Sequence, residues 1–100
     1  MTEYVVEIQV ETLSREPADV VKLDAVGGRL ATHEVAMRTH DARVWVTVTV
    51  GAAGPPDALG MAYGIVAGAL DAVGEPGEYR AATVWTGGEY DRLVREEAGD

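Results

Sequence analysis

Residues 43–50 read RVWVTVTV and hold the strongest secondary-structure signal in the chain. Valines at positions 44, 46, 48 and 50 alternate with Trp45, Thr47 and Thr49. A period of two puts the valines on one face of a β-strand and the other side chains on the opposite face. Because β-branched and aromatic residues favour strands, we expect a strand with one buried valine face and a second face that carries Trp45.

Residues 30–39 come just before this strand and predict a partner for it in a hairpin, with residues 41 and 42 in the turn. The register consists of three pairs, His40 with Arg43, Met37 with Val46 and Val35 with Val48. A slip of one residue would move the apolar side chains of one strand to the wrong face. The same register places Arg38 opposite Trp45, where a guanidinium can lie over the indole ring.

The remaining patterns predict two further strands and three helices. Alternation indicates strands at residues 3–11 and 79–86. A helix is expected at residues 14–28, with Ser14 as its N-cap and Pro17 in its first turn. A second helix is expected from the proline pair at position 55 to about residue 73, and a short third one at residues 89–97.

The order of these elements is β-α-β-β-α-β. It resembles the ferredoxin-like arrangement, an α+β fold with a four-stranded antiparallel sheet and two helices on one face. Strands one and three would lie at the centre of the sheet. Residues 1–88 would form this single domain, and residues 89–100 a short C-terminal helix and acidic tail. The second sheet face would lack a cover, which small domains of this architecture supply by pairing into a dimeric α+β barrel.

Composition excludes several classes of function. The chain has 100 residues, a formal charge of −9 and no cysteine, so disulfides and thiolate sites are excluded. An acidic chain repels phosphate backbones, and we expect no nucleic-acid partner. No stretch is suited to a signal peptide or a membrane span, and we expect a cytoplasmic protein. Nucleotide and catalytic-serine motifs are absent, and adjacent His40 and Asp41 are a weak metal signal, so no cofactor, metal or catalytic residue is assigned.

The uncovered sheet face is the first candidate binding site. A tryptophan on such a face is typical of an interface or a ligand site. Alternatively, Trp45 packs beneath the C-terminal segment, against Tyr90 and Leu93. In a regular last strand Tyr79 and Trp85 share one side, and their bulk favours the core, although the outward orientation stays open. The candidate binding residues are Glu7, Gln9, Arg38, His40, Trp45 and Thr47.

The second helix offers another surface. Its expected core stripe is Leu59, Ala62, Tyr63, Val66, Ala69, Leu70 and Val73. The opposite face lacks charge and carries glycines at a spacing of four, which suits close approach of another backbone. Alternatively, a composition bias toward glycine and alanine accounts for these glycines without any interface. The candidate interface residues are Gly60, Met61, Gly64, Ile65 and Gly68.

Two functions remain open at this point. The first is a non-catalytic module for protein interaction or small-ligand binding, homo-oligomeric or part of a larger assembly. The alternative is a small cofactor-free enzyme of the dimeric α+β barrel type, an isomerase, cyclase or monooxygenase acting on an aromatic or polyketide-like substrate. The pocket of such an enzyme would be lined by Glu7, Arg38, His40, Trp45 and either Tyr63 or Tyr79.

Overall fold

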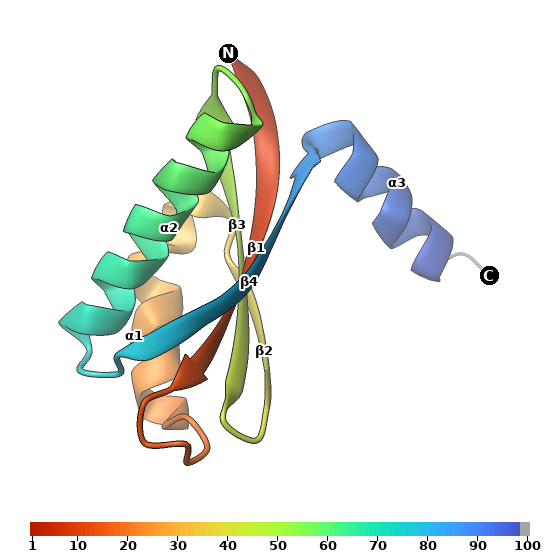
Figure 1. Ribbon diagram of the computed structural model, residues 1–100. Coiled ribbons are helices and arrows are strands. Elements are labelled where there is room, and N and C mark those ends of the chain that lie inside the picture. The colour runs from red at the N-terminus through yellow and green to blue at the C-terminus, as the bar shows by residue number, and fades with distance from the viewer. Residues whose placement is uncertain (99–100) are drawn as a thin grey trace.

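The computed structural model describes residues 1–98 and consists of a sheet, two helices packed on it, and a third helix that projects from it (Figure 1). In chain order the elements are β1 (Thr2–Thr12), α1 (Val20–Arg29), the short 3₁₀ helix η1 (Ala31–His33), β2 (Ala36–His40), β3 (Arg43–Ala52), α2 (Pro55–Ala72), β4 (Gly77–Thr86) and α3 (Gly87–Ala98). The end of the expected acidic tail, residues 99 and 100, lies outside the described residues.

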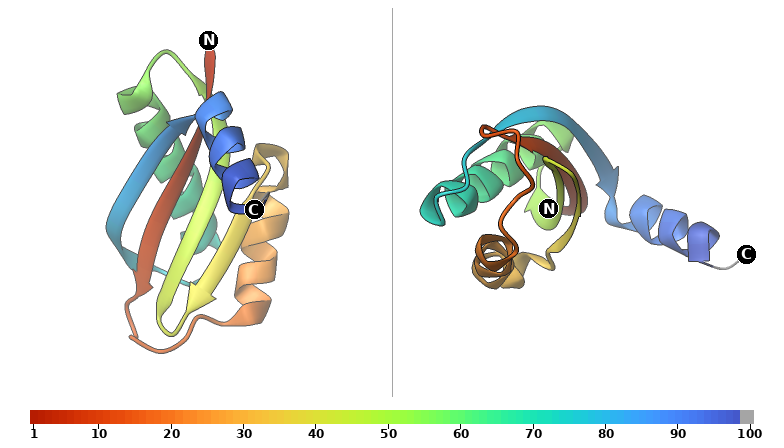
Figure 2. Two further views of the ribbon diagram at one scale, coloured as in Figure 1. Left: turned by 90° about the vertical axis from the view of Figure 1, so that its right-hand side faces the viewer. Right: turned by 90° about the horizontal axis from the view of Figure 1, so that it is seen from below.

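The four strands form one sheet in the order β2-β3-β1-β4, and every neighbouring pair is antiparallel. The expected α+β class and four-stranded antiparallel sheet are therefore confirmed, with β1 and β3 at the centre. Helices α1 and α2 lie on one face of the sheet (Figure 1). The opposite face, called the open face below, is turned toward the viewer in the left view of Figure 2, where only α3 crosses in front of it.

The β2–β3 hairpin has the register expected from the alternation of its side chains. His40 lies opposite Arg43, Met37 opposite Val46 and Arg38 opposite Trp45. Asp41 takes a positive φ of 52° in the two-residue turn, a conformation that Asp tolerates better than most residues. The expected pair of Val35 with Val48 lies beyond the strand, because β2 begins only at Ala36.

The valine face of β3 forms the centre of the hydrophobic core. Val46 and Val48 are fully buried, and Val6 and Ile8 of β1 lie beside them with at most 2% exposure. The helices complete this core with Leu23, Val26, Ala58, Ala62, Val66, Ala69 and Leu70. Burial of each of the valine, leucine and isoleucine side chains among them contributes about 1.5–3 kcal/mol to the free energy of folding. The apolar contacts between the sheet and helices α1 and α2 are therefore the main source of stability.

The first helix begins later than the sequence pattern indicates, so the expected start at Ser14 is wrong. The carboxylate of Asp19 accepts hydrogen bonds from the backbone N–H groups of Val21 and Lys22 and is the N-cap of α1. Ser14 only accepts a hydrogen bond from the Glu16 N–H in the preceding turn. A carboxylate also interacts favourably with the positive end of the helix dipole, which explains why Asp19 starts the helix.

The segment after α1 also differs from the expected strand at residues 30–39. Its first part forms η1, and Glu34 has a left-handed φ of 53° that ends this turn. Only Ala36–His40 pairs with β3. The apolar residues of the segment thus belong to two elements, η1 and β2. Alternation of apolar and polar residues alone does not show where one element ends and the next begins.

We predict that Asp19→Ala lowers the free energy of unfolding by about 1 kcal/mol, because the first-turn N–H groups lose their acceptor. The matched control is Ser14→Ala, which changes only a turn and should stay within about 0.5 kcal/mol of the parent. Urea denaturation followed by circular dichroism measures both at one protein concentration. An equal cost for the two substitutions would contradict Asp19 as the cap.

Candidate functional site on the open sheet face

A register shift in β4 decides which aromatic side chains reach the open face. The pairing of β1 with β4 shifts between Gln9 and Val10. Tyr79 consequently lies opposite the core residue Val10, whereas Trp85 lies opposite Val5 on the open face. A β-bulge reverses the side-chain parity along one strand, so the expectation that Tyr79 and Trp85 share one side is wrong. Both tryptophans of the chain belong to the open face.

The two tyrosines considered for an enzyme pocket lie on the helix-covered side. The rings of Tyr63 and Tyr79 pack at a centroid distance of 4.6 Å. Burial, with the neighbouring Tyr63, raises the pKa of the Tyr79 phenol. Since the sheet separates this pair from Trp45, Tyr63 and Tyr79 do not line the same pocket as Trp45.

Trp45 and Arg38 form the centre of the candidate site. The guanidinium carbon of Arg38 lies 4.3 Å from the indole centroid, as the hairpin register predicted. Arg38 Nη2 lies 3.9 Å from a carboxylate oxygen of Glu7 on the other side. These side chains border a groove of about 140 Å³ lined by Glu7, Ala36, Met37, Arg38, Trp45, Thr47 and Tyr90. Four of the six candidate residues therefore meet in one place.

The other two candidates lie outside this groove. Gln9 is half-buried on β1 and pairs with Trp45 across the strands, but it does not line the groove. His40 sits at the hairpin tip, where its side chain is 81% exposed and lies 3.4 Å from Asp41. Gln9 and His40 lie on the same face of the sheet as Trp45, as expected, but His40 lies at the end of the sheet and not beside Trp45.

Tyr90, which the sequence indicates only as an alternative packing partner of Trp45, lines the groove. Its ring lies 5.3 Å from that of Trp85, between centroids. The residues around it start α3 with a capping box. The Thr86 N–H donates to the Glu89 carboxylate at 3.0 Å, and the Glu89 N–H donates to the Thr86 hydroxyl at 3.2 Å. The T-x-x-E spacing at positions 86–89 is the sequence signal that reveals this start.

This cap influences both the charge and the direction of α3. The hydrogen bonds from Thr86, backbone first, hold the pKa of Glu89 below its ordinary value. Helix α3 projects away from the body of the domain (Figure 2, right). Leu93 is half-buried and Val94 is 43% exposed. The expected cover for Trp45 is thus limited to the base of α3.

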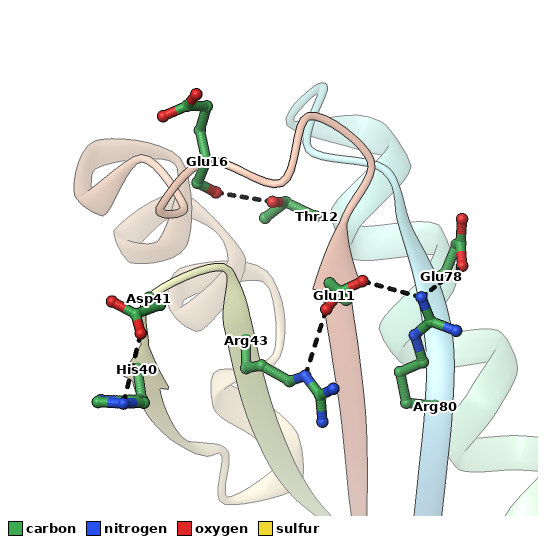
Figure 3. A network of polar contacts seen from close by, with 8 residues as sticks. All are labelled: Glu11, Thr12, Glu16, His40, Asp41, Arg43, Glu78 and Arg80. Atoms are coloured by element: carbon green, nitrogen blue, oxygen red, sulfur yellow. Dashed lines mark hydrogen bonds and ion pairs between the residues drawn. The ribbon is translucent and has the colours of Figure 1, made fainter.

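At the far end of the open face, Glu11 joins three strands (Figure 3). Its carboxylate accepts from Arg80 Nη2 of β4 at 2.8 Å and from Arg43 Nε of β3 at 3.4 Å. Arg80 also lies 2.9 Å from Glu78. The hydrogen bond from Arg80 is the main reason that the pKa of Glu11 is lowered, although exposure to solvent weakens such pairs. Both charges of each pair are therefore already compensated.

The glycines on the outer surface of α2 face open space, but the two apolar residues beside them, Met61 and Ile65, differ from each other in burial. A Cβ added at Gly60, Gly64 or Gly68 would meet nothing within 4 Å. Met61 is 46% exposed, whereas Ile65 packs partly against the core. Leu59 and Tyr63, expected in the core stripe, are instead 40% and 48% exposed. Ala58 is fully buried, so the face of α2 that contacts the core is rotated toward Ala58 and away from Leu59 and Tyr63.

Comparisons with known proteins give no family for the chain: no family model matches it, and no curated protein or solved structure is significantly similar to it. Among the described residues no three acidic or histidine side chains gather as metal ligands. In residues 1–98, no helix is long and apolar enough to cross a membrane. The open face is therefore the feature of the molecule that points to a function.

We predict that Glu11 makes folding sensitive to acid. Its pKa is lowered in the folded state, so its contribution to stability is present above the ordinary value of 4.5 and is lost as pH falls through the folded pKa. Glu11→Gln should therefore destabilise the protein more at pH 7 than at pH 3. Urea denaturation at both pH values measures this difference.

The control for this experiment is Glu16→Gln, because Glu16 contributes its backbone carbonyl, which accepts from the Thr12 hydroxyl (Figure 3). Its effect should be equal at the two pH values. Carboxyl chemical shifts measured by NMR give the Glu11 pKa directly. Titration of Glu11 at its ordinary value would contradict the role assigned to Arg80 and Arg43.

Proposed function

We propose that the chain is a non-catalytic self-association module, a ferredoxin-like βαββαβ domain that pairs with a second copy through its open face. One observation carries this proposal: Trp45, Trp85 and Tyr90 gather on the sheet face that neither α1 nor α2 covers. Large aromatic side chains are the usual anchors of protein interfaces. The strand order β2-β3-β1-β4, with helices on one face, supports the ferredoxin-like assignment and a two-fold pairing of sheets.

The charges on the open face favour a second copy as the partner. The chain carries a net charge of −9, so two copies repel each other over most of their surfaces. Arg38, Arg43 and Arg80, three of the eight basic residues, lie on the open face and each has an acidic neighbour. Burial of charges that are already paired avoids the high cost of an isolated buried charge. The paired charges thus allow the open face to contact a second copy without burying an isolated charge.

The shape of the open face favours association over binding of a small molecule. Two adjoining hollows lie on it, one of about 140 Å³ at Trp45 and one of about 370 Å³ beside α3, and both are open to solvent, whereas small-molecule sites bury most of the ligand surface. A shallow, partly aromatic surface with a polar rim is instead typical of a protein interface. A second copy can also cover the whole face, which a small ligand at Trp45 cannot.

We predict a dimer in solution whose two tryptophans are shielded. Because both tryptophans of the chain lie on the open face, tryptophan emission, excited without exciting tyrosine, reports on this face alone. Light scattering should give twice the mass of the chain, and dilution should shift the emission to longer wavelength and increase quenching by acrylamide. A monomer at all concentrations would contradict the proposal.

The variant Trp45→Lys should raise the dimer Kd about 30-fold or more, the loss of about 2 kcal/mol expected for an anchor residue. The control is Met61→Lys, which places the same charge on the exposed outer surface of α2. It should leave the dimer Kd unchanged. If Met61→Lys dissociates the protein and Trp45→Lys does not, the interface lies on α2 and the proposal is wrong.

A further inference from the structure

Helix α3 leaves the sheet in a direction that local interactions determine. The side chains of Thr86 and Glu89 each accept a hydrogen bond from the other residue's backbone N–H. The ring of Trp85, just before this capping box, packs against the ring of Tyr90, just after it. A capping box combined with an apolar contact between these two positions sets the angle at which a chain enters a helix. No loop separates β4 from α3, since β4 ends at Thr86 and α3 begins at Gly87. The direction in which α3 projects is therefore fixed by specific interactions at its first turn.

Along α3, apolar side chains form a stripe that its own sheet covers only in part. Tyr90, Leu93 and Val94 follow one another at the three- and four-residue spacing that forms a stripe along a helix. Val94 is 43% exposed. Between this stripe and the sheet lies an open groove of about 370 Å³, bordered by Glu7, Arg38, Trp85, Tyr90, Leu93, Val94 and Glu97. The stripe and the open face thus face each other across a gap.

The chain cannot close this gap by itself without giving up its cap. Folding α3 down onto its own sheet would change the entry angle that Thr86, Glu89 and the Trp85–Tyr90 contact maintain. The helix is also short for the surface: 12 residues span about 18 Å, whereas the ten residues of β3 span about 33 Å. It starts at the end of the sheet where Tyr4 pairs with Thr86, and Trp45 lies toward the opposite end.

We infer that α3 is an exchanged arm: in the dimer, α3 of each copy lies on the open face of the other and covers Trp45 there. This inference rests on the proposed self-association. Under two-fold symmetry the partner's arm enters from the end of the sheet that the chain's own α3 leaves free. Each arm then buries its apolar stripe, and each sheet receives a cover, with no change in the cap. A second copy fits both vacant surfaces because each copy supplies the piece that the other lacks.

Charge neither attracts nor excludes the arm at this position. Within residues 87–97, α3 carries four acidic and two basic side chains. Arg43 and Arg80 lie at the end of the open face where the partner's arm enters, but both already pair with Glu11, and Arg80 pairs with Glu78 as well. The arm is therefore recognised through its apolar stripe and not through charge.

Cross-linking between isotopically distinct copies tests the exchange directly. The chain has no cysteine, so Leu93→Cys can be labelled at one position with a benzophenone maleimide. The labelled variant is equilibrated with ¹⁵N-labelled parent protein and irradiated, and linked peptides are identified by mass spectrometry. We expect links from position 93 of the light chain to peptides of the heavy chain that contain Trp45 or Glu7. Arg92→Cys, on the other side of α3, is the control and should give at least about fivefold fewer such links.

A second variant measures the contribution of the arm to association. Leu93→Asp combined with Val94→Asp should raise the dimer Kd about 30-fold or more. Far-ultraviolet circular dichroism verifies that the domain stays folded, which we expect because these side chains contribute little to the core. The same two substitutions to alanine preserve helix propensity and should raise the dimer Kd by a smaller factor.

The outcomes separate the arm from the self-association on which it rests. If the protein is a dimer with shielded tryptophans but all links from position 93 stay within one chain, the exchange is wrong and the proposed function stands. A dimer whose Kd is unchanged by the two aspartates also overturns the exchange. A protein that is monomeric at every concentration overturns both.

Discussion

The packing of the β3 valines against α2 is the interaction on which the rest of the structure depends. Val46 and Val48 are fully buried, and Ala62 and Val66 of α2 are buried with them in one core. Because side chains alternate along a strand, burial of these valines forces Trp45 and Thr47 onto the other face. The same constraint places Arg38 over Trp45 through the hairpin register. The candidate site is thus a geometric consequence of the core.

A single irregularity gives this site its second tryptophan. The register shift opposite Gln9 and Val10 turns Tyr79 toward the helices and Trp85 toward the open face. An uninterrupted β4 would put both aromatic side chains on one side. The shift occurs at the end of the sheet where Glu11 binds arginines from both neighbouring strands. The bulge therefore separates a core tyrosine from a surface tryptophan within one strand, and it brings Trp85 into contact with Tyr90.

The capped start of α3 links the sheet to the self-association that we propose. Thr86 and Glu89 satisfy each other's backbone donors, so the helix is stable at its base without lying on the sheet. Its apolar stripe and the open face remain available together. Two uncovered surfaces joined by a short, well-defined connection favour exchange between copies, since exchange buries both surfaces and keeps every local interaction.

The amino-acid sequence by itself determined the α+β class, the antiparallel hairpin with its register, and the parity that places Trp45 on the open face. These features follow from side-chain periodicity within single segments, which is a local property. Tertiary structure alone decided the start of α1 at Asp19, the bulge that turns Trp85 outward, and the position of Tyr90 beside the groove. The start of α1 is a choice between two possible caps, and the register of β4 is a choice between two pairings with β1; packing between segments far apart in the sequence selects one alternative of similar energy in each case. The direction of α3 is set by its own capping box, but the position of Tyr90 beside the groove also depends on where the sheet places Trp45.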